Sequence, residues 1–310
     1  MKLLNSLNPW HRSQPPLARY RQQRRGVRLK TWLSAAPVHL TLVAIALLWT
    51  LPTAGLWISS LRPAADLSQS GWWTVFQHPF ELTQYSLQNY RDVLTAEHMG
   101  RAFLNSLMIT LPATLIPVAI ATLAAYGLAW MRFPGRQMIM VGIVGLLVVP
   151  LQMTLIPVLR SYRDLGLVGQ FAAVWLAHTG YGLPLGIYLL RNYIGSLPRE
   201  VLDAAAIDGA SHWQTLTKLV VPLSLPAIAS FAVFQFLWVW NDFLVALVYL
   251  GAANEVAPVT VQLSRLVGSR GQDWHLLTAG AFVTMVVPLA VFFALQRQFV
   301  RGILAGSLKG

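Results

Sequence analysis

Few residues in this chain have the types and spacing that chemistry requires. Only 11% of the 310 residues are charged, 55% are hydrophobic, and there is no cysteine. Patterns for a phosphate-binding P-loop, a zinc protease, a serine nucleophile and a dinucleotide-binding turn are all absent. The chain therefore has no P-loop of its own for ATP, and the sequence predicts no catalytic residue.

The histidines do not form a metal site. None has a neighbour at the spacing of zinc ligands, and the seven are scattered: His11, His39, His78, His98, His178, His212 and His275. His178 lies in a strongly apolar segment. We interpret it as a hydrogen-bonded interior residue, with ligand binding as the alternative.

Asp242 is the acidic residue that stands out inside an apolar stretch, 219–254. An ionisable side chain is costly in lipid, so Asp242 should face water or the interior of a helix bundle. It could line a solute path or relay protons. The plainer interpretation is a structural contact at one end of a helix. No chain of further proton-relay groups accompanies it, which weakens the case for a proton-coupled carrier.

A polar island at 198–226 lies between two apolar segments and carries Arg199, Glu200, Asp203, Asp208 and Lys218. Pro198 suits the first turn of a helix, and Ala204, Ala205 and Ala206 favour its continuation to Gly209, which reaches positive φ easily. Ser211 and Gln214 have the spacing of a capping box and predict a second helix. We expect Pro222 and Pro226 to end that helix. The sequence thus predicts a short helix, a glycine hinge and a short helix.

Long charge-poor segments position this island. A membrane-spanning helix needs about 20 apolar residues, and six segments qualify: 31–61, 102–131, 137–159, 165–190, 219–254 and 274–296. The sequence therefore predicts an all-α integral membrane protein with six transmembrane helices. Prolines and glycines within the second to fourth segments suit kinked, closely packed helices.

The distribution of basic residues predicts the orientation. Sixteen of the 23 Lys and Arg residues lie in segments on the side of the N-terminus, and cytoplasmic loops carry such an excess. Both termini and the polar island are thus predicted to be cytoplasmic. We expect a basic cytoplasmic tail at 1–32 and a transmembrane domain at 33–310, with a periplasmic loop at 62–101. The net charge of +12 then requires no nucleic acid, although a basic tail could also bind RNA or anionic lipid.

The predicted periplasmic loop is rich in aromatic residues: Trp72, Trp73, Phe76, Phe80, Tyr85 and Tyr90. Such residues usually lie at the lipid interface. A docking surface for an external partner is the alternative.

The polar island resembles the EAA motif of permease subunits of ABC importers. In that motif three residues separate Glu-Ala-Ala from a Gly, and nine residues separate this Gly from Ile-x-Leu-Pro. This chain has Asp203-Ala204-Ala205, then Gly209, then Leu219-Val220-Val221-Pro222, with both spacings kept. Asp replaces Glu, so the strength of any salt bridge at Asp203 differs from the family pattern. Further stretches are similar to the carbohydrate branch with six spans: Asn105-Ser106-Leu107, Ala125-Tyr126-Gly127, Arg132-Phe133 and Trp240-Asn241-Asp242-Phe243. The stretches 272–280 and 299–302 look most like α-glucoside and glucosylglycerol permeases.

This resemblance implies a bacterial inner-membrane importer with a second permease subunit, an ABC ATPase dimer and an extracytoplasmic solute-binding protein. ATP and Mg would be held by the ATPase partner, and this chain would bind no cofactor. The loop 196–222 would be the coupling loop between the fourth and fifth spans, seated in the ATPase. The residues implied in coupling are Glu200, Asp203, Ala204, Ala205, Asp208, Gly209, Ala210 and Pro222.

The scarcity of charge within the apolar segments suits a neutral, hydroxyl-rich solute. Aromatic and polar side chains that could line its path are Trp175, Tyr181, Trp238, Trp240, Asn241 and Asp242. The alternative is that the aromatic residues serve packing and that the partner permease makes the sugar contacts. An ion-coupled carrier acting alone and a membrane scaffold without transport are the other functions to be distinguished.

Overall fold

The computed structural model describes residues 17–267 and 273–307, with side chains for 36–267 and 273–296. Within these residues the chain is helical and contains no strand, which confirms the all-α part of the predicted fold class. The chain divides into two compact units, 1–56 and 57–310. The predicted basic tail at 1–32 lies outside the residues with described side chains, so its role stays a prediction.

The first unit consists of most of helix α1 (Leu17–Ser60), whose apolar part Ala36–Ser60 is long enough to span a membrane. Pro37 and Pro52 lie inside it. The hydroxyl of Thr41 donates a hydrogen bond of 2.9 Å to the carbonyl of Pro37. A single helix cannot bury its own leucines, so this segment requires lipid or other helices around it.

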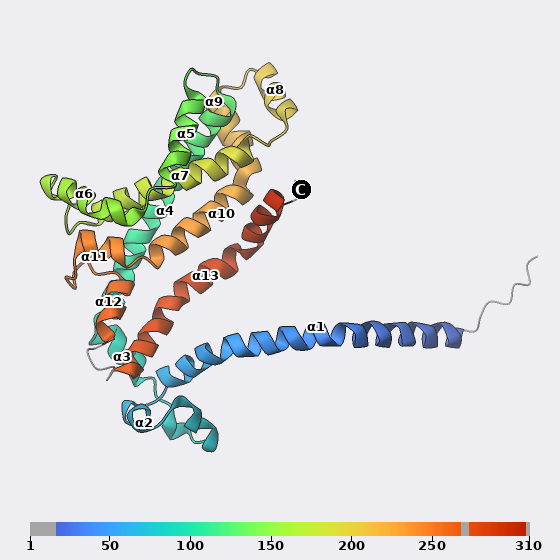
Figure 1. Cartoon of the computed structure of the whole chain (residues 1–310), viewed down its shortest axis with the longest axis vertical. Helices are drawn as coiled ribbons and strands as arrows, with labels where there is room; N and C mark the ends of the chain where they lie inside the picture. Colours follow the sequence, from blue (N-terminus) through green and yellow to red (C-terminus); the bar gives the residue numbers. More distant parts are fainter. Residues whose placement is uncertain (1–16, 268–272, 308–310) are drawn as a thin grey trace, which may run out of the picture. The chain divides into compact units, whose positions relative to one another are not determined.

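The second unit is a bundle of long helices joined by shorter ones (Figure 1). Three further helical stretches are long and apolar enough to span a membrane: α4 (Met99–Trp130), the continuous run His212–Trp240, and the part Trp274–Gln296 of α13 (Trp274–Ser307). Helices α5 (Arg136–Leu146) and α6 (Leu151–Asp164) together pass the same test but are bent by 101°. The described residues thus contain four candidate spans, or five if the bent pair is one span.

The third predicted segment, 137–159, is therefore two helices rather than one. Pro150 caps α6 and, because it has no N–H and restricts the residue before it, favours the break at this point. The fourth predicted segment, 165–190, corresponds to α7 (Phe171–Ile194), which has 24 residues but falls short of the apolar limit for a span. Six spans accordingly stay a prediction.

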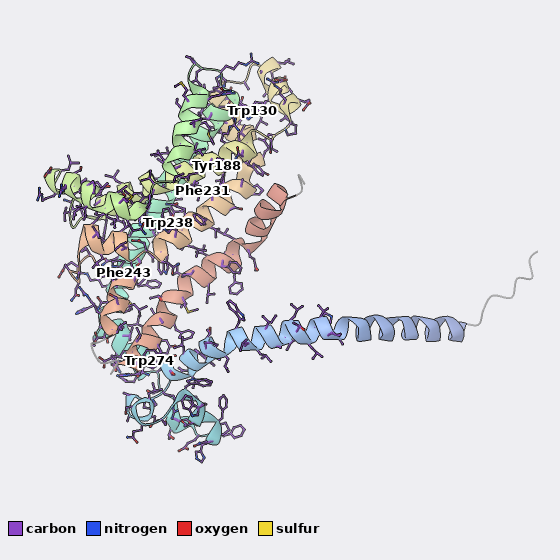
Figure 2. All side chains as sticks on the ribbon, viewed as in Figure 1. Trp130, Tyr188, Phe231, Trp238, Phe243 and Trp274 are labelled. Carbon is purple, nitrogen blue, oxygen red and sulfur yellow. The ribbon has the colours of Figure 1, made fainter. Side chains whose placement is uncertain are left out.

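Helices α4, α7 and α10 (Val221–Trp240) form the centre of the bundle. Gly186 on α7 allows their close approach, because a Cβ there would lie 2.4 Å from the ring of Phe231 on α10 and 3.0 Å from Ala121 on α4. Figure 2 shows Phe231 within the bundle and Trp130 at its end near the short helices α8 and α9. This packing fixes the distance between the helices that carry the candidate site.

The expectation that Pro222 and Pro226 end a helix is wrong. Helix α9 (His212–Thr215) continues through a π-helical turn, η3 (Leu216–Val220), into α10, which contains both prolines. A proline clashes with the carbonyl four residues earlier, and for Pro222 that carbonyl belongs to Lys218 in the π turn. The wider turn displaces this carbonyl, so the helix continues.

Short helices complete the chain. The segment 62–101 contains α2 (Ala64–Gln69), η1 (Trp72–Gln77), η2 (Leu82–Gln84) and α3 (Gln88–Thr95). Asn89 fixes its base to the end of α1 through hydrogen bonds to the carbonyls of Ser60 and Arg62, at 3.0 and 2.8 Å. Helix α8 (Arg199–Ile207) precedes α9, and α11 (Leu244–Leu250) and α12 (Val259–Leu266) connect α10 to α13.

Candidate functional site: a helix-turn-helix loop and an aromatic cavity

The predicted hinge of the loop 196–222 is present. Helix α8 begins after Pro198 and ends with Asp208 as its last cap. Gly209 has φ +74°, and the N–H groups of Gly209 and Ala210 bond to the carbonyls of Ala206 and Ala205 at 3.1 and 2.9 Å. These two bonds form a Schellman motif, which satisfies carbonyls that the helix end leaves free.

The predicted capping box that opens α9 is also present. The hydroxyl of Ser211 accepts a hydrogen bond from the Gln214 N–H at 3.3 Å, and the Gln214 side chain accepts one from the Ser211 N–H at 2.8 Å. Both helices therefore have locally fixed ends on either side of Gly209. The turn between them is a rigid corner.

Most residues that the resemblance implied in coupling are exposed in this chain: Glu200, Asp203, Ala204, Asp208, Gly209 and Pro222. Ala205 is buried, and Ala210 is partly buried. Among the ion pairs in the described part of the chain, none includes an acidic residue of this loop. Its carboxylates are thus available to a partner.

Two large apolar side chains of the loop were missed by the sequence analysis. Ile207 is 86% exposed and Trp213 is 65% exposed, and they lie on opposite sides of the Gly209 turn. The signal was a large apolar residue on each side of the hinge, at the last position of α8 and the second position of α9. Large exposed apolar side chains on both sides of a rigid turn are typical of surfaces that bind a partner protein.

The end of α7 just before the loop and the start of α9 after the hinge are both tied to the last turns of α4. The indole N–H of Trp130 donates a hydrogen bond of 3.0 Å to the carbonyl of Ile194, where α7 ends. One turn earlier, the hydroxyl of Tyr126 lies 3.0 Å from Nδ1 of His212, in the first turn of α9. We call Tyr126 and Trp130 the α4 clamp. Because residues four apart share a helix face, one face of α4 holds the end of α7 and the start of α9.

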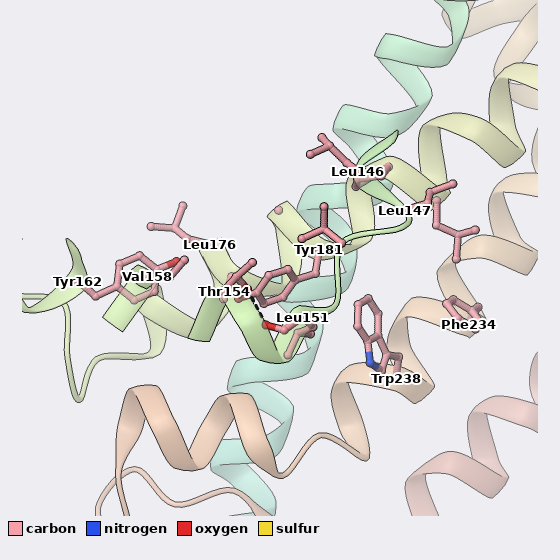
Figure 3. Close-up of a pocket in the computed structure, with 15 residues that line it drawn as sticks. Leu146, Leu147, Leu151, Thr154, Val158, Tyr162, Leu176, Tyr181, Phe234 and Trp238 are labelled. Atoms are coloured by element: carbon pink, nitrogen blue, oxygen red, sulfur yellow. Dashed lines mark hydrogen bonds between the residues drawn. The ribbon is translucent and has the colours of Figure 1, made fainter. Parts of the chain in front are cut away.

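A cavity of about 600 Å³ lies between the α5–α6 bend, α7 and α10 (Figure 3). Tyr181 and Trp238, both expected on a solute path, line it from α7 and α10. The other lining residues are Leu146, Leu147, Val149, Leu151, Thr154, Val158, Tyr162, Leu176, Ala177, Gly180, Pro184, Leu185 and Phe234. None of the lining residues is charged.

Two hydroxyl groups on the wall of this cavity, those of Thr154 and Tyr181, begin a row that continues to the buried Tyr249. Thr154 Oγ1 lies 2.8 Å from the Tyr181 hydroxyl, which lies 3.1 Å from the hydroxyl of Tyr249 on α11. Thr154 and Tyr249 also reach the carbonyls of Leu151 and Leu155, at 2.7 and 3.4 Å. The three hydroxyl groups have one proton each but make four contacts, so one contact lacks a donated proton. Their oxygens also keep lone pairs that are free to accept hydrogen bonds.

The other residues expected on the path lie elsewhere. Trp175 donates its indole N–H to the carbonyl of Met108 at 3.0 Å. Trp240 is 2% exposed, stacks on Phe236 and donates to the carbonyl of Thr284 at 3.1 Å. Asn241 donates to the carbonyl of Leu237 at 2.7 Å, and it does not line the cavity.

Asp242 stands at the start of α11. Its carboxylate accepts hydrogen bonds from the N–H groups of Val245 and Ala246, at 3.3 and 2.9 Å. Nε2 of the buried His178 lies 3.6 Å from the same carboxylate, and the His178 ring packs edge-on against Trp238. This arrangement caps a helix and joins α7 to the end of α10 behind the cavity wall.

The described residues contain no group of three or more His, Cys, Asp or Glu side chains that could hold a metal ion. The site therefore consists of two parts, a loop suited to a protein partner and an uncharged cavity suited to a solute.

The chain is similar to curated permeases over most of its length. It is 70% identical over 273 residues, 88% of this chain and 92% of the relative, to the osmoprotective compounds uptake permease of Synechocystis sp.. It is 43% identical to the alpha-glucoside transport system permease of Rhizobium meliloti, covering 88% of this chain and 97% of that protein.

The fold also matches a solved bacterial ABC transporter involved in the import of alginate, with a TM-score of 0.68 at 22% identity, over 87% of this chain and 97% of that chain. The model of a protein family matches residues 117–304. On this evidence the chain belongs to the family of binding-protein-dependent transport system inner membrane components.

Proposed function

We propose that this permease subunit forms half of a path for a neutral sugar or glucoside, and that the loop 196–222 couples this path to a cytoplasmic ATPase. The observation that carries the proposal is the cavity beside Tyr181 and Trp238, which has aromatic faces and hydroxyl groups but no charge. Aromatic faces suit the apolar face of a sugar ring, and the free lone pairs of the hydroxyl row can accept hydrogen bonds from sugar hydroxyls. The names of the two relatives described above support this class of solute.

The proposed topology has six spans with both termini in the cytoplasm. Helix α7 would be the fourth span, since it packs along α4 and has 24 residues, and the bent α5–α6 pair would be the third. The segment 62–101 would then be periplasmic and the coupling loop cytoplasmic. The excess of Lys and Arg on the loop side of the bundle supports this orientation.

The proposed partners are a second permease, an ATPase pair that holds ATP and Mg, and a solute-binding protein outside the inner membrane. On the cytoplasmic side, Ile207 and Trp213 would enter a cleft of the ATPase while Asp203 and Asp208 meet basic residues at its rim. On the periplasmic side, the exposed rings of Trp73, Phe76 and Phe80 offer a surface to the binding protein or to the lipid interface. The α4 clamp would then carry movement of the loop into the spans.

Transport by the reconstituted complex tests this proposal. Proteoliposomes that contain the complex and its binding protein should take up a neutral α-glucoside only when ATP is present on the side of the membrane where the ATPase lies. A glucuronide of matched size should be taken up at least about tenfold more slowly, because its carboxylate would enter a cavity without a basic partner. Uptake without ATP would indicate an ion-coupled carrier, and no uptake of either compound would indicate a scaffold.

A further inference from the structure

Three arginines gather where the ends of α4, α5 and α7 meet. Two adjoining cavities of about 400 and 340 Å³ share Arg136 and Gln137; the first also reaches Arg132, and the second reaches Arg191. No acidic side chain lines either cavity. Within the residues that the structure describes, none of these three arginines takes part in an ion pair. The groove is therefore a concentrated positive site.

The guanidinium groups have more N–H donors than the surrounding protein has acceptors for them. Nε of Arg191 is buried without a hydrogen-bond partner, and its Nη1 reaches only the side chain of Asn192, at 3.4 Å. Arg136 donates to the carbonyls of Met131 and Ala129, at 3.1 and 3.5 Å. Arg136 is also the first residue of α5, where the helix dipole disfavours a positive side chain. An anion in the groove would offset both costs.

The surface beside this positive groove is apolar. On the next turns of α5, Met138 is 80% exposed, Val141 is 72% exposed and Ile139 is 49% exposed. None of the side chains of α5 is fully buried, although Met140 and Ile143 pack partly against the bundle. A small soluble anion would match the arginines alone, whereas an amphiphile with an anionic head matches the arginines and the apolar face together.

We propose that this groove binds an anionic phospholipid. The headgroup phosphate would lie between Arg136 and Arg191, and an acyl chain would follow Met138 and Val141 along α5. The bound lipid would bridge the start of α5 and the end of α7, beside the entry to the coupling loop. The inference rests on the proposed topology for one point, the placement of this groove at the cytoplasmic face.

Native mass spectrometry of the assembled complex tests the site. The complex would be extracted from nanodiscs that contain phosphatidylglycerol and phosphatidylcholine, and the retained phosphatidylglycerol would be counted. The double variant R136Q/R191Q should retain roughly tenfold less, which corresponds to the loss of two charge-assisted contacts. The matched control R160Q/R163Q changes two exposed arginines of α6 and should retain as much as the unmodified complex.

Two further variants separate the sources of binding. R136K/R191K keeps both charges and should retain most of the phosphatidylglycerol. This variant still tests the site if R136Q/R191Q assembles poorly. M138S/V141S should lose phosphatidylglycerol while binding inorganic phosphate as weakly as the unmodified complex.

The proposal is overturned if R136Q/R191Q retains normal phosphatidylglycerol, or if excess inorganic phosphate displaces the lipid. It is also overturned if that variant loses the ATPase or the second permease while its lipid count is unchanged, because the arginines would then bind a protein. Lipid retention is measured without transport, so failure of the sugar path or of the coupling loop would leave this result unaffected.

Discussion

At the scale of single residues, Gly209 and Tyr181 each have one local property on which the proposed function depends. Gly209 has a positive φ, with no atom within 4 Å of the place where a Cβ would stand. Its constraint is therefore backbone conformation and not space. Tyr181 is the central hydroxyl of a row in which Thr154 and Tyr181 line the cavity. Its contribution is therefore one hydrogen-bonding group.

Replacing Gly209 with Val should abolish solute-stimulated ATP hydrolysis while the chain still inserts into the membrane. A β-branched residue at φ +74° adds backbone strain of about 1–2 kcal/mol. The turn can relieve this strain by leaving the positive φ, which changes the angle between α8 and α9. The measurement is ATPase activity of the reconstituted complex with and without loaded binding protein. Gly142→Ala is the control, since Gly142 has open space around it, no positive φ and no place in the cavity lining. Normal stimulation in G209V would contradict a role for the corner in coupling.

Replacing Tyr181 with Phe should weaken transport of an α-glucoside without affecting assembly. Loss of one hydrogen bond, about 0.5–1.5 kcal/mol, predicts a fall of roughly 3-fold to 10-fold in transport efficiency. Initial uptake rates over a range of solute concentrations measure it. Tyr188→Phe, on the same helix but away from the cavity lining, should change nothing. Equal effects of the two variants would show that Tyr181 acts through helix packing.

At the scale of elements, the loop 196–222 shows what sequence can predict. Helix capping, the Schellman turn and the positive φ of Gly209 depend on residues within a few positions of each other, and all were predictable. The end of the second helix was not predictable, because a π turn before Pro222 removes the clash that the proline would otherwise cause. That turn has no reliable signal in a single sequence.

The exposed apolar pair of the loop should dominate its binding to the ATPase. Truncating Ile207 and Trp213 together to Ala should weaken association of the ATPase by at least about tenfold, since buried anchors at interfaces contribute 1–2 kcal/mol or more each. Retention of the ATPase during purification and titration of the isolated ATPase onto the permease pair both measure this. Thr217→Ala, on an exposed position one turn after Trp213, is the control. Unchanged association would place the ATPase contact on another surface.

The α4 clamp should transmit the movement of the loop. The double variant Tyr126→Phe with Trp130→Phe removes two hydrogen bonds, so ATP hydrolysis should continue while solute uptake per ATP falls severalfold. Trp175→Phe is a matched control, because it removes an equivalent indole-to-carbonyl bond of 3.0 Å at Met108, away from the loop. Parallel loss of hydrolysis and uptake in the clamp variant would show instead that the clamp only stabilises the fold.

At the scale of the whole molecule, the chain is a multi-pass permease subunit of an ABC importer and is not itself an enzyme. Its membrane character followed from composition, and its family followed from the spacing of the loop residues. The cavity could not be predicted, because Thr154, Tyr181 and Tyr249 come from three helices whose register depends on packing over long sequence distances. Tyr181 was found by residue type alone, and Trp240, chosen in the same way, is buried against Phe236.

The π turn at Leu216–Val220 has a consequence for the evolution of specificity. An α-helix rotates by about 100° per residue, and a π turn accommodates one residue more than an α turn. The turn therefore absorbs one inserted residue locally, and the residues of α10 beyond it keep their faces. A change of one codon in length at this turn would leave Trp238 at the wall of the cavity, so the connection to the coupling loop can vary in length without altering the side chains that line the cavity.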